Sequence, residues 1–195
     1  MALSKALGLG RRKAVTLTLF GLVALLFCGG LGVIVRSASA TEYQVKAVFL
    51  FNFAQFVEWP AEAFPDRDAP LIIGVLGQDP FGSYLDETVR GERVNSRQLV
   101  VQRYRRVEDV KNCHLLFISR SEGDHLEQIV NSLRYRRILT VSDADISAKS
   151  GVIIRFVTEQ NKIKLRISIA AARAANLTIS SKLLRLAEIV APGKD

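Results

Sequence analysis

Residues 42–60 read EYQVKAVFLFNFAQFVEWP, and the rest of the chain is organised around this stretch. At 3.6 residues per turn its apolar side chains share one broad face, made by Val45, Val48, Phe49, Phe53 and Phe56 and widened by Leu50, Ala54 and Val57. A narrow polar wedge holds Gln44, Gln55 and Glu58, and Phe51 falls inside it. A helix that is apolar almost all round is either a core helix or a membrane segment. This one carries Lys46 and ends at Trp59-Pro60, so it is too polar and too short for a span of about 20 apolar residues. We therefore expect a central helix packed on at least two sides.

The first forty residues have the composition of an export signal. Residues 1–14 carry four positive charges, and residues 14–35 are apolar or small except for two threonines and one cysteine. Ser37-Ala38-Ser39-Ala40 then supplies an A-x-A site, which predicts a signal peptide over 1–40 with cleavage after Ala40. The alternative is an uncleaved anchor, because about 20 apolar residues can span a bilayer. In both cases residues 41–195 are expected to form a single domain in the periplasm.

The net charge argues against nucleic-acid binding. The whole chain carries +8 at pH 7, but five basic residues and no acidic ones precede residue 41. The remaining 22 basic and 19 acidic residues leave a charge of only +3, and they are interspersed. Because nucleic-acid binding needs a concentrated basic patch, we expect an ordinary mixed-charge surface and no nucleic-acid partner.

Strand and helix patterns alternate along the body of the chain. Apolar runs of strand length occupy 71–76, 99–104, 114–119 and 138–142, with helical patterns between them at 84–89, 107–111 and 125–133. This alternation predicts parallel strands, right-handed crossovers and helices on both faces of the sheet.

The pattern changes towards the C-terminus. Strands over 151–157 and 162–168 flank the turn residues 158–161, which predicts a hairpin. Helices are expected over 170–176 and 182–190, the last with an apolar stripe made by Leu183, Leu186, Ala187 and Val190. The predicted fold is α/β: three layers, with a mostly parallel sheet, helices on both faces and a C-terminal antiparallel hairpin.

Polar residues follow several of the predicted parallel strands. Ligands of open parallel sheets bind beyond the carboxyl ends of the strands. The residues expected at that edge are Gly77, Asp79, Ser119, Arg120, Ser121, Ser142 and Asp143. Their hydroxyls, arginine and backbone amides would suit a small polar or anionic ligand. The alternative is that they only form strand-to-helix turns and helix caps.

The residues that usually carry catalysis do not form a recognisable pattern. The chain has no G-x-G-x-x-G, P-loop or G-x-S-x-G motif, and its two histidines, His114 and His125, lack metal-ligand spacing. After cleavage Cys113 is the one remaining cysteine, which excludes an intrachain disulfide and favours a buried structural role. We expect no enzyme activity, no cofactor and no metal.

Six segments, in order, resemble one family. They are EYQVKAVFLFNFAQFVEWP (42–60), LIIGVLGQDPFG (71–82), VNSRQLVVQR (94–103), CHLLFISRSE (113–122), ILTVSD (138–143) and ISIAAARAANLTISSKLLRLAEIV (167–190). Together they resemble the YfiR family of periplasmic proteins, formerly grouped as a domain of unknown function.

The resemblance implies a regulator. YfiR-like proteins bind the periplasmic sensor domain of an inner-membrane diguanylate cyclase and repress cyclic-di-GMP synthesis and biofilm formation. The family further implies sequestration by an OmpA-like outer-membrane lipoprotein, a possible homodimer, and redox control through disulfides. This chain departs from the last point, because Cys113 would have to pair between chains.

Two functions therefore remain open for the sequence. In the first, the domain is a repressor that grips its partner with apolar side chains such as Phe51 and Trp59, although either could instead belong to the core. In the second, it senses a small nucleotide or amino acid at the edge formed by Gly77, Arg120 and Asp143. An unrecognised hydrolase is disfavoured by the absence of a catalytic triad.

Overall fold

The computed structural model describes residues 37–145 and 150–190, and the chain from Ala40 onward forms one compact unit. The predicted signal segment lies outside the described residues up to residue 36. Residues 37–40 belong to a helix, so the predicted cleavage point after Ala40 falls inside helix α2, Ser37–Phe56. The sequence placed the start of this helix at residue 42. Among the described residues, no helix is long and apolar enough to cross a membrane.

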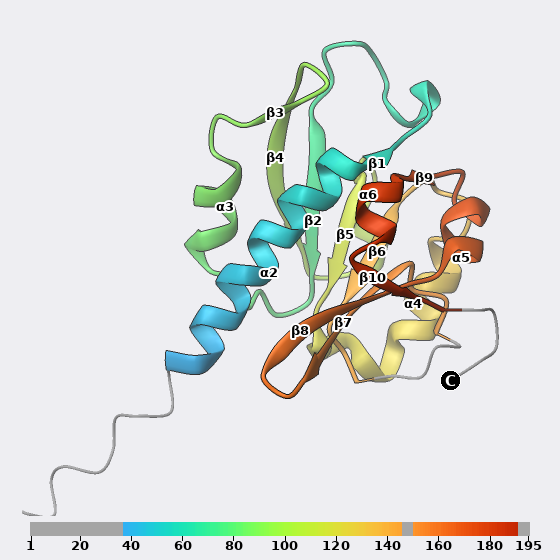
Figure 1. The fold of residues 1–195 in the computed structure, drawn as a ribbon. Helices are drawn as coiled ribbons and strands as arrows, with labels where there is room; N and C mark the ends of the chain where they lie inside the picture. The colour runs from blue at the N-terminus through green and yellow to red at the C-terminus, as the bar shows by residue number, and fades with distance from the viewer. Residues whose placement is uncertain (1–36, 146–149, 191–195) are drawn as a thin grey trace, which may run out of the picture. The chain divides into compact units, whose positions relative to one another are not determined.

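Within the described residues, eight strands form one sheet (Figure 1). Their order is β10-β8-β7-β6-β5-β2-β4-β3. The strands are β2 Leu71–Leu76, β3 Arg93–Val94, β4 Arg97–Tyr104, β5 Leu115–Ile118, β6 Leu139–Ser142, β7 Ile154–Glu159, β8 Lys162–Ile167 and β10 Ala187–Ile189. Strands β4, β2, β5, β6 and β7 run parallel, and β8 returns antiparallel to β7. This arrangement confirms the predicted mostly parallel sheet with an antiparallel hairpin.

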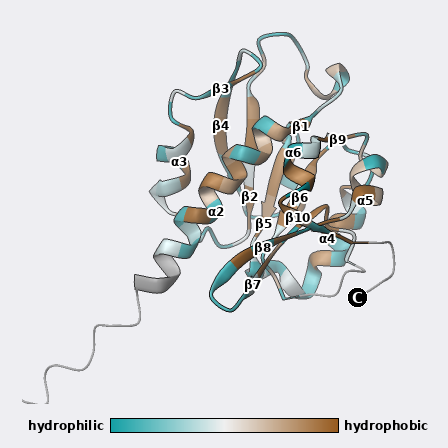
Figure 2. Ribbon diagram, viewed as in Figure 1, coloured by the Kyte–Doolittle hydropathy of each residue, from teal (hydrophilic) through white to brown (hydrophobic). Residues whose placement is uncertain are grey.

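Helices cover both faces of this sheet, which gives the predicted three layers (Figures 1 and 2). Alternate residues along the strands enter different cores: Ile73 and Val75 pack under α2 and under α3, Ser83–Val89, whereas Leu76 packs on the opposite face. That opposite face is covered by α4, Leu126–Ser132, which follows the 3-10 turn η3, Arg120–His125. The six residues of β2 are all buried, as a strand covered on both faces requires.

Helix α2 lies across the sheet, and its buried face matches the predicted one only in part. Val45 and Val48 are 42% and 50% exposed, whereas Lys46 is 1% exposed. Leu50, Phe53, Ala54 and Val57 of the predicted face are buried, and Ala47 joins them. Since the helix has apolar residues on nearly every side, hydropathy alone could not say which side would meet the sheet.

The helix also ends earlier than Pro60. It stops at Phe56, and Val57–Glu58 form β1, which pairs antiparallel with β9, Thr178–Ile179. The Ser180 N–H donates to the Phe56 carbonyl at 2.8 Å, so this small sheet continues directly from the end of the helix. A short 3-10 turn, Ala61–Ala63, then begins the connection to β2.

The predicted last helix over 182–190 is wrong. Helix α5, Ile169–Ala174, is followed by a single helical turn, α6, Ser181–Leu184, and then by strand β10. Of the predicted apolar stripe, Leu183 is buried but Leu186 is 70% exposed. Strand β10 pairs parallel with β8 and so satisfies backbone groups at the edge of the sheet, an arrangement that outweighs helix propensity.

A smaller difference lies before β4. The short strand β3 pairs antiparallel with β4 across Asn95-Ser96, and both turn residues have positive φ, 49° and 69°. The sequence prediction began this strand only at residue 99. Strand ends and short edge strands depend on backbone pairing, which leaves a weak hydropathy pattern.

Candidate functional site

The loops after β2 and β5 close on one another at the carboxyl edge of the sheet. The Gln78 N–H donates to Ser121 Oγ at 3.0 Å, and the Ser121 N–H donates to Ser119 Oγ at 3.4 Å. Gly77 has φ +87°, and a Cβ there would come within 2.5 Å of Ser121 Oγ. Glycine is required at this position because the two loops approach so closely. Of the predicted site residues, the structure thus brings Gly77, Ser119 and Ser121 together. They form a turn and a helix cap.

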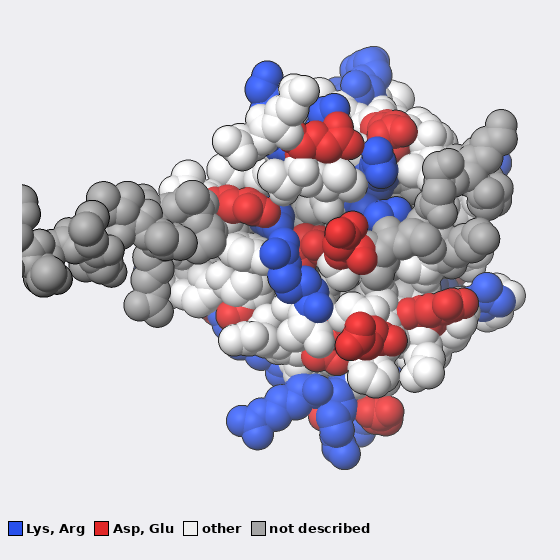
Figure 3. Space-filling view, turned by 90° about the horizontal axis from the view of Figure 1, so that it is seen from below, with Lys and Arg blue, Asp and Glu red and all other residues white. Residues whose placement is uncertain are grey.

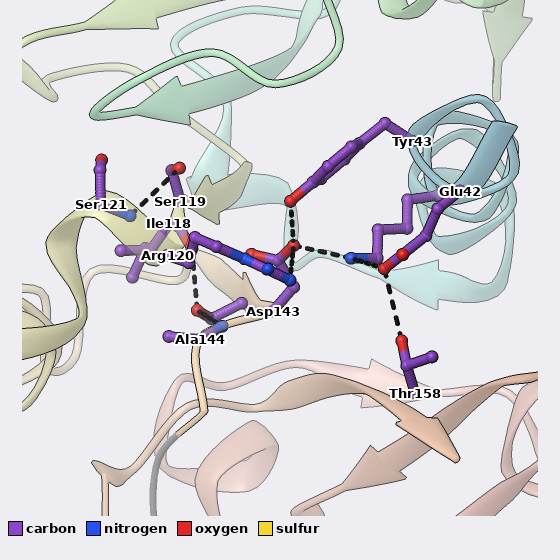
Figure 4. Close-up of polar contacts among 11 residues, drawn as sticks. Glu42, Tyr43, Ile118, Ser119, Arg120, Ser121, Asp143, Ala144 and Thr158 are labelled. Atoms are coloured by element: carbon purple, nitrogen blue, oxygen red, sulfur yellow. Dashed lines mark hydrogen bonds and ion pairs between the residues drawn. The ribbon is translucent and has the colours of Figure 1, made fainter. Parts of the chain in front are cut away.

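Asp143 follows β6 and is the centre of a buried charged cluster (Figure 4). Its Oδ2 accepts hydrogen bonds from Lys46 Nζ at 2.7 Å and from the Tyr43 hydroxyl at 2.7 Å. Arg120 Nη2 approaches the same oxygen at 3.3 Å. Lys46 also pairs with Glu42 Oε1 at 2.6 Å, one helical turn earlier on α2. The cluster therefore joins the N-terminal half of α2 to the ends of β5 and β6.

Burial and charge set the ionisation of the groups around Asp143. Burial, followed by the hydrogen bond to Asp143, raises the pKa of the Tyr43 hydroxyl well above its usual value, so Tyr43 is a protonated donor. Burial alone would lower the pKa of Arg120, but the nearby Asp143, Tyr43 and Glu42 together outweigh it, and the result is a raised pKa. Both groups thus stay fixed as donors to one carboxylate oxygen. The other oxygen, Asp143 Oδ1, is buried and has no hydrogen-bond partner among the described residues.

The remaining predicted residues behave differently from Arg120 and Asp143. Ser142 Oγ donates to the Ile118 carbonyl at 2.8 Å and accepts the Ala144 N–H at 3.1 Å, so it joins the ends of β5 and β6. Asp79 accepts the Phe81 N–H and forms an ion pair with Arg103 Nε at 2.7 Å. Asp79 is therefore part of a separate surface ion pair on β4.

Sequence reasoning missed Lys46 and Tyr43 as parts of this cluster. Lys46 stood out as a charge in a nearly all-apolar helix, and Asp143 as a carboxylate directly after a buried strand. Because a buried charge must be paired, these two observations together could have suggested the contact. Nothing in the sequence shows that residues 97 positions apart would meet.

The predicted partner-binding residues lie against the core. Phe51 and Trp59 are half-buried and pack against the core beneath α2, and Trp59 Nε1 donates to the His114 carbonyl at 3.1 Å. Each still presents some surface to solvent. Their role in partner binding stays a prediction.

The side chains of Cys113 and His114 are buried in the fold. Cys113 is 6% exposed, and burial raises the pKa of its thiol to about 12. His114 accepts the Ile72 N–H at its Nδ1 and approaches the Ala63 carbonyl with its Nε2, and burial lowers the pKa of its imidazole to about 4. Within the part of the chain that is described, no three His, Cys, Asp or Glu side chains are grouped as metal ligands would be.

The face at the carboxyl edge, seen from below in Figure 3, carries acidic and basic side chains side by side. A surface of this kind lacks the single-sign field that concentrates nucleic acid. The arrangement can hold and orient charged groups, and the described side chains show no nucleophile–base–orienter series.

Comparison with known proteins identifies a family for this chain. A family model described as "DUF4154: YfiR/HmsC-like" matches residues 43–188, from the first turns of α2 to strand β10. Among curated proteins, none matches the chain. Since the match covers well over half of the chain, the protein belongs to the YfiR/HmsC-like family.

Proposed function

We propose that this protein is an exported, non-catalytic regulator that binds the periplasmic sensor domain of an inner-membrane diguanylate cyclase and represses cyclic-di-GMP synthesis. The observation that carries the proposal is the family match over residues 43–188. Export would use residues 1–40 as a cleaved signal peptide, which would deliver the domain to the periplasm.

The engagement of the polar side chains supports a role without catalysis. The pair of Asp143 and Lys46 is buried, and His114 is held by backbone groups on both ring nitrogens. A general base must reach a substrate proton, and a buried imidazole engaged on both sides cannot. The described residues offer a rigid scaffold whose outer surface remains available for a partner.

The effect on signalling can be tested in cells that carry such a cyclase. Expressing the protein should lower cyclic-di-GMP, measured by mass spectrometry, when the cyclase is intact. Cells whose cyclase lacks its periplasmic domain serve as the control and should show no change. An equal fall in both strains would contradict the proposal, because the repression would then not pass through the periplasmic domain.

The surface used for the partner is proposed to include Phe51 and Trp59. Replacing Phe51 with Asp should reduce capture of the cyclase from solubilised membranes about tenfold or more, since aromatic residues dominate interface energetics. Val45→Asp on the same helix is the matched control, because Val45 is already 42% exposed. Capture by a folded Phe51→Asp protein at the wild-type level would remove Phe51 from the interface.

We further propose that an OmpA-like lipoprotein of the outer membrane can sequester the regulator and that the protein can form a homodimer. Sequestration would compete with binding to the cyclase, so excess lipoprotein should restore cyclic-di-GMP.

A further inference from the structure

A pocket of about 260 Å³ adjoins the charged cluster, between residues 143–145, which directly follow β6, and the β7–β8 hairpin. Its lining includes Lys46, Arg120, Asp143, Arg155, Thr158 and Arg166. These residues come from α2, η3, the end of β6 and the two hairpin strands. Pockets at the carboxyl edge are where open parallel sheets hold their ligands.

Two of the arginines lie directly opposite one another. Arg155 on β7 is the cross-strand partner of Arg166 on β8, so the two side chains project from the same face of the hairpin. Like charges in directly opposite positions destabilise a strand pair. Arg166 is oriented by Glu188 at 2.9 Å and Glu159 at 3.3 Å. Arg166 is therefore held in place by acidic partners, and a guanidinium group has N–H donors beyond those two contacts for an anion in the pocket.

The opposite side of the pocket supplies another cation and an acceptor. The Arg120 side chain is 62% exposed and reaches Asp143 through a contact of 3.3 Å. Asp143 itself is 1% exposed at the side chain, and its Oδ1 has no hydrogen-bond partner among the described residues. A buried carboxylate oxygen without a partner is unfavourable, and a donor placed in the pocket would satisfy it.

We propose that this pocket binds a small carboxylate that also carries a hydroxyl or amino group. The carboxylate is held between Arg155 and Arg166, whose planar guanidinium groups match its two oxygens, with Arg120 at the rim. The hydroxyl or amino group donates to Asp143 Oδ1. The pocket volume of about 260 Å³ lies just below the range for small-molecule sites, about 300–1,000 Å³, which suits a hydroxy acid or amino acid better than a nucleotide. Binding of this ligand is independent of any cyclase partner.

Calorimetric titration of the full-length protein, as isolated from cells, with malate, aspartate, succinate and inorganic phosphate tests the proposal. Malate or aspartate should bind, and succinate, which lacks the donor, should bind about tenfold more weakly because Asp143 Oδ1 then stays unsatisfied. If malate and aspartate at concentrations up to about 10 mM produce no heat of binding, the proposal is overturned, because a dissociation constant above that value is too weak for a specific site. Phosphate binding as tight as malate would overturn the assignment of a hydroxy- or amino-carboxylate.

Three variants locate the site. Arg155→Gln and Arg166→Gln should each weaken binding about tenfold or more, since each removes a charge-assisted hydrogen bond. Arg120→Gln should also weaken binding. Because Arg120 is exposed and tolerates substitution, this variant still tests the site if a hairpin variant does not fold. Arg173→Gln, exposed on α5 and outside the pocket, is the control and should bind normally. Unchanged binding in folded Arg155→Gln, Arg166→Gln or Arg120→Gln would place the ligand elsewhere and refute the proposal.

Discussion

Lys46 has an environment that is unusual for a lysine, because it is buried. Its ammonium is buried between Glu42 and Asp143 and lies 4.4 Å from the centre of the Tyr43 ring. A buried ion pair is weak support for stability, because the desolvation penalty offsets most of the attraction. Its stronger effect is on orientation, because the pair determines which face of an apolar helix packs against the sheet. We infer that this contact orients α2.

Replacing Lys46 with Met should lower the free energy of unfolding by roughly 3–5 kcal/mol, because Asp143 would remain buried without its main counter-ion. Urea unfolding followed by circular dichroism measures the change. Adding Asp143→Asn to Lys46→Met should recover part of the loss. Lys182→Met, at an exposed position, is the control. A loss below about 1 kcal/mol for Lys46→Met would mean that the ion pair contributes little beyond a surface pair.

At the scale of elements, the β7–β8 hairpin depends on a connection of two residues. Gln160 and Asn161 join the strands with φ of 50° and 60°, the left-handed pair that a two-residue hairpin turn requires. Asparagine tolerates this conformation, but glutamine is strained by its Cβ. Because the pocket arginines lie on these two strands, the turn helps to set the register that places them opposite one another.

Replacing Gln160 with Gly should therefore stabilise the protein by about 0.5–1 kcal/mol, since glycine has no Cβ to strain. The thermal unfolding midpoint provides the measurement. Gln160→Ala, which shortens the side chain but keeps the Cβ, is the control and should not stabilise. A destabilised Gln160→Gly variant would show that the side chain makes a contact that outweighs the strain.

At the scale of the whole molecule, His114 ties the segment after α2 to the centre of the sheet. The Ile72 N–H donates to its Nδ1 at 3.0 Å, its ring stacks on Phe64 at 4.3 Å, and its carbonyl accepts both Trp59 Nε1 and the Leu139 N–H. The hydrogen bond at Nδ1 requires the neutral ring with its proton on Nε2. Protonation would break this bond inside the core.

The global stability should consequently depend on pH through His114. Burial lowers its pKa to about 4, whereas an unfolded histidine titrates near 6.5, so below that value the unfolded chain binds the extra proton. Stability is present in full above about pH 6.5 and is lost as the pH falls towards 4, by roughly 3 kcal/mol over the window.

Urea unfolding at several pH values between 7 and 4 measures this effect. The slope attributable to His114 is the difference between the wild type and His114→Gln, whatever the absolute stability of the variant. His125→Gln, at an exposed histidine, should keep the wild-type slope. Equal slopes for the wild type and His114→Gln would show that the imidazole is not held neutral.

The parallel strands could be predicted from the sequence because burial on both faces leaves a continuous apolar run, as in Leu71–Leu76. The structure of the C-terminal region could not be predicted in this way. Residues 182–190 satisfy a helical pattern locally, but residues 187–189 pair with the edge of β8, a partner about 20 positions away that local periodicity does not register.

The candidate site, too, could be predicted from the sequence only in part. Arg120 and Asp143 could be placed at the carboxyl edge because they directly follow predicted strands. Asp79 follows a strand equally well, but it pairs with Arg103 instead of joining the cluster. Side-chain direction and the reach of neighbouring groups decide such cases, and neither can be derived from position alone.

The sequence by itself therefore determined the order of the strands along the chain, the family and the polar character of the carboxyl edge, because hydropathy and local motifs are properties of neighbouring residues. Only the tertiary structure decided which face of α2 is buried, that Lys46 meets Asp143, and that Arg155 stands opposite Arg166. Those contacts join residues far apart in the chain, and they follow from burial and backbone pairing, which are settled only when all the elements pack together.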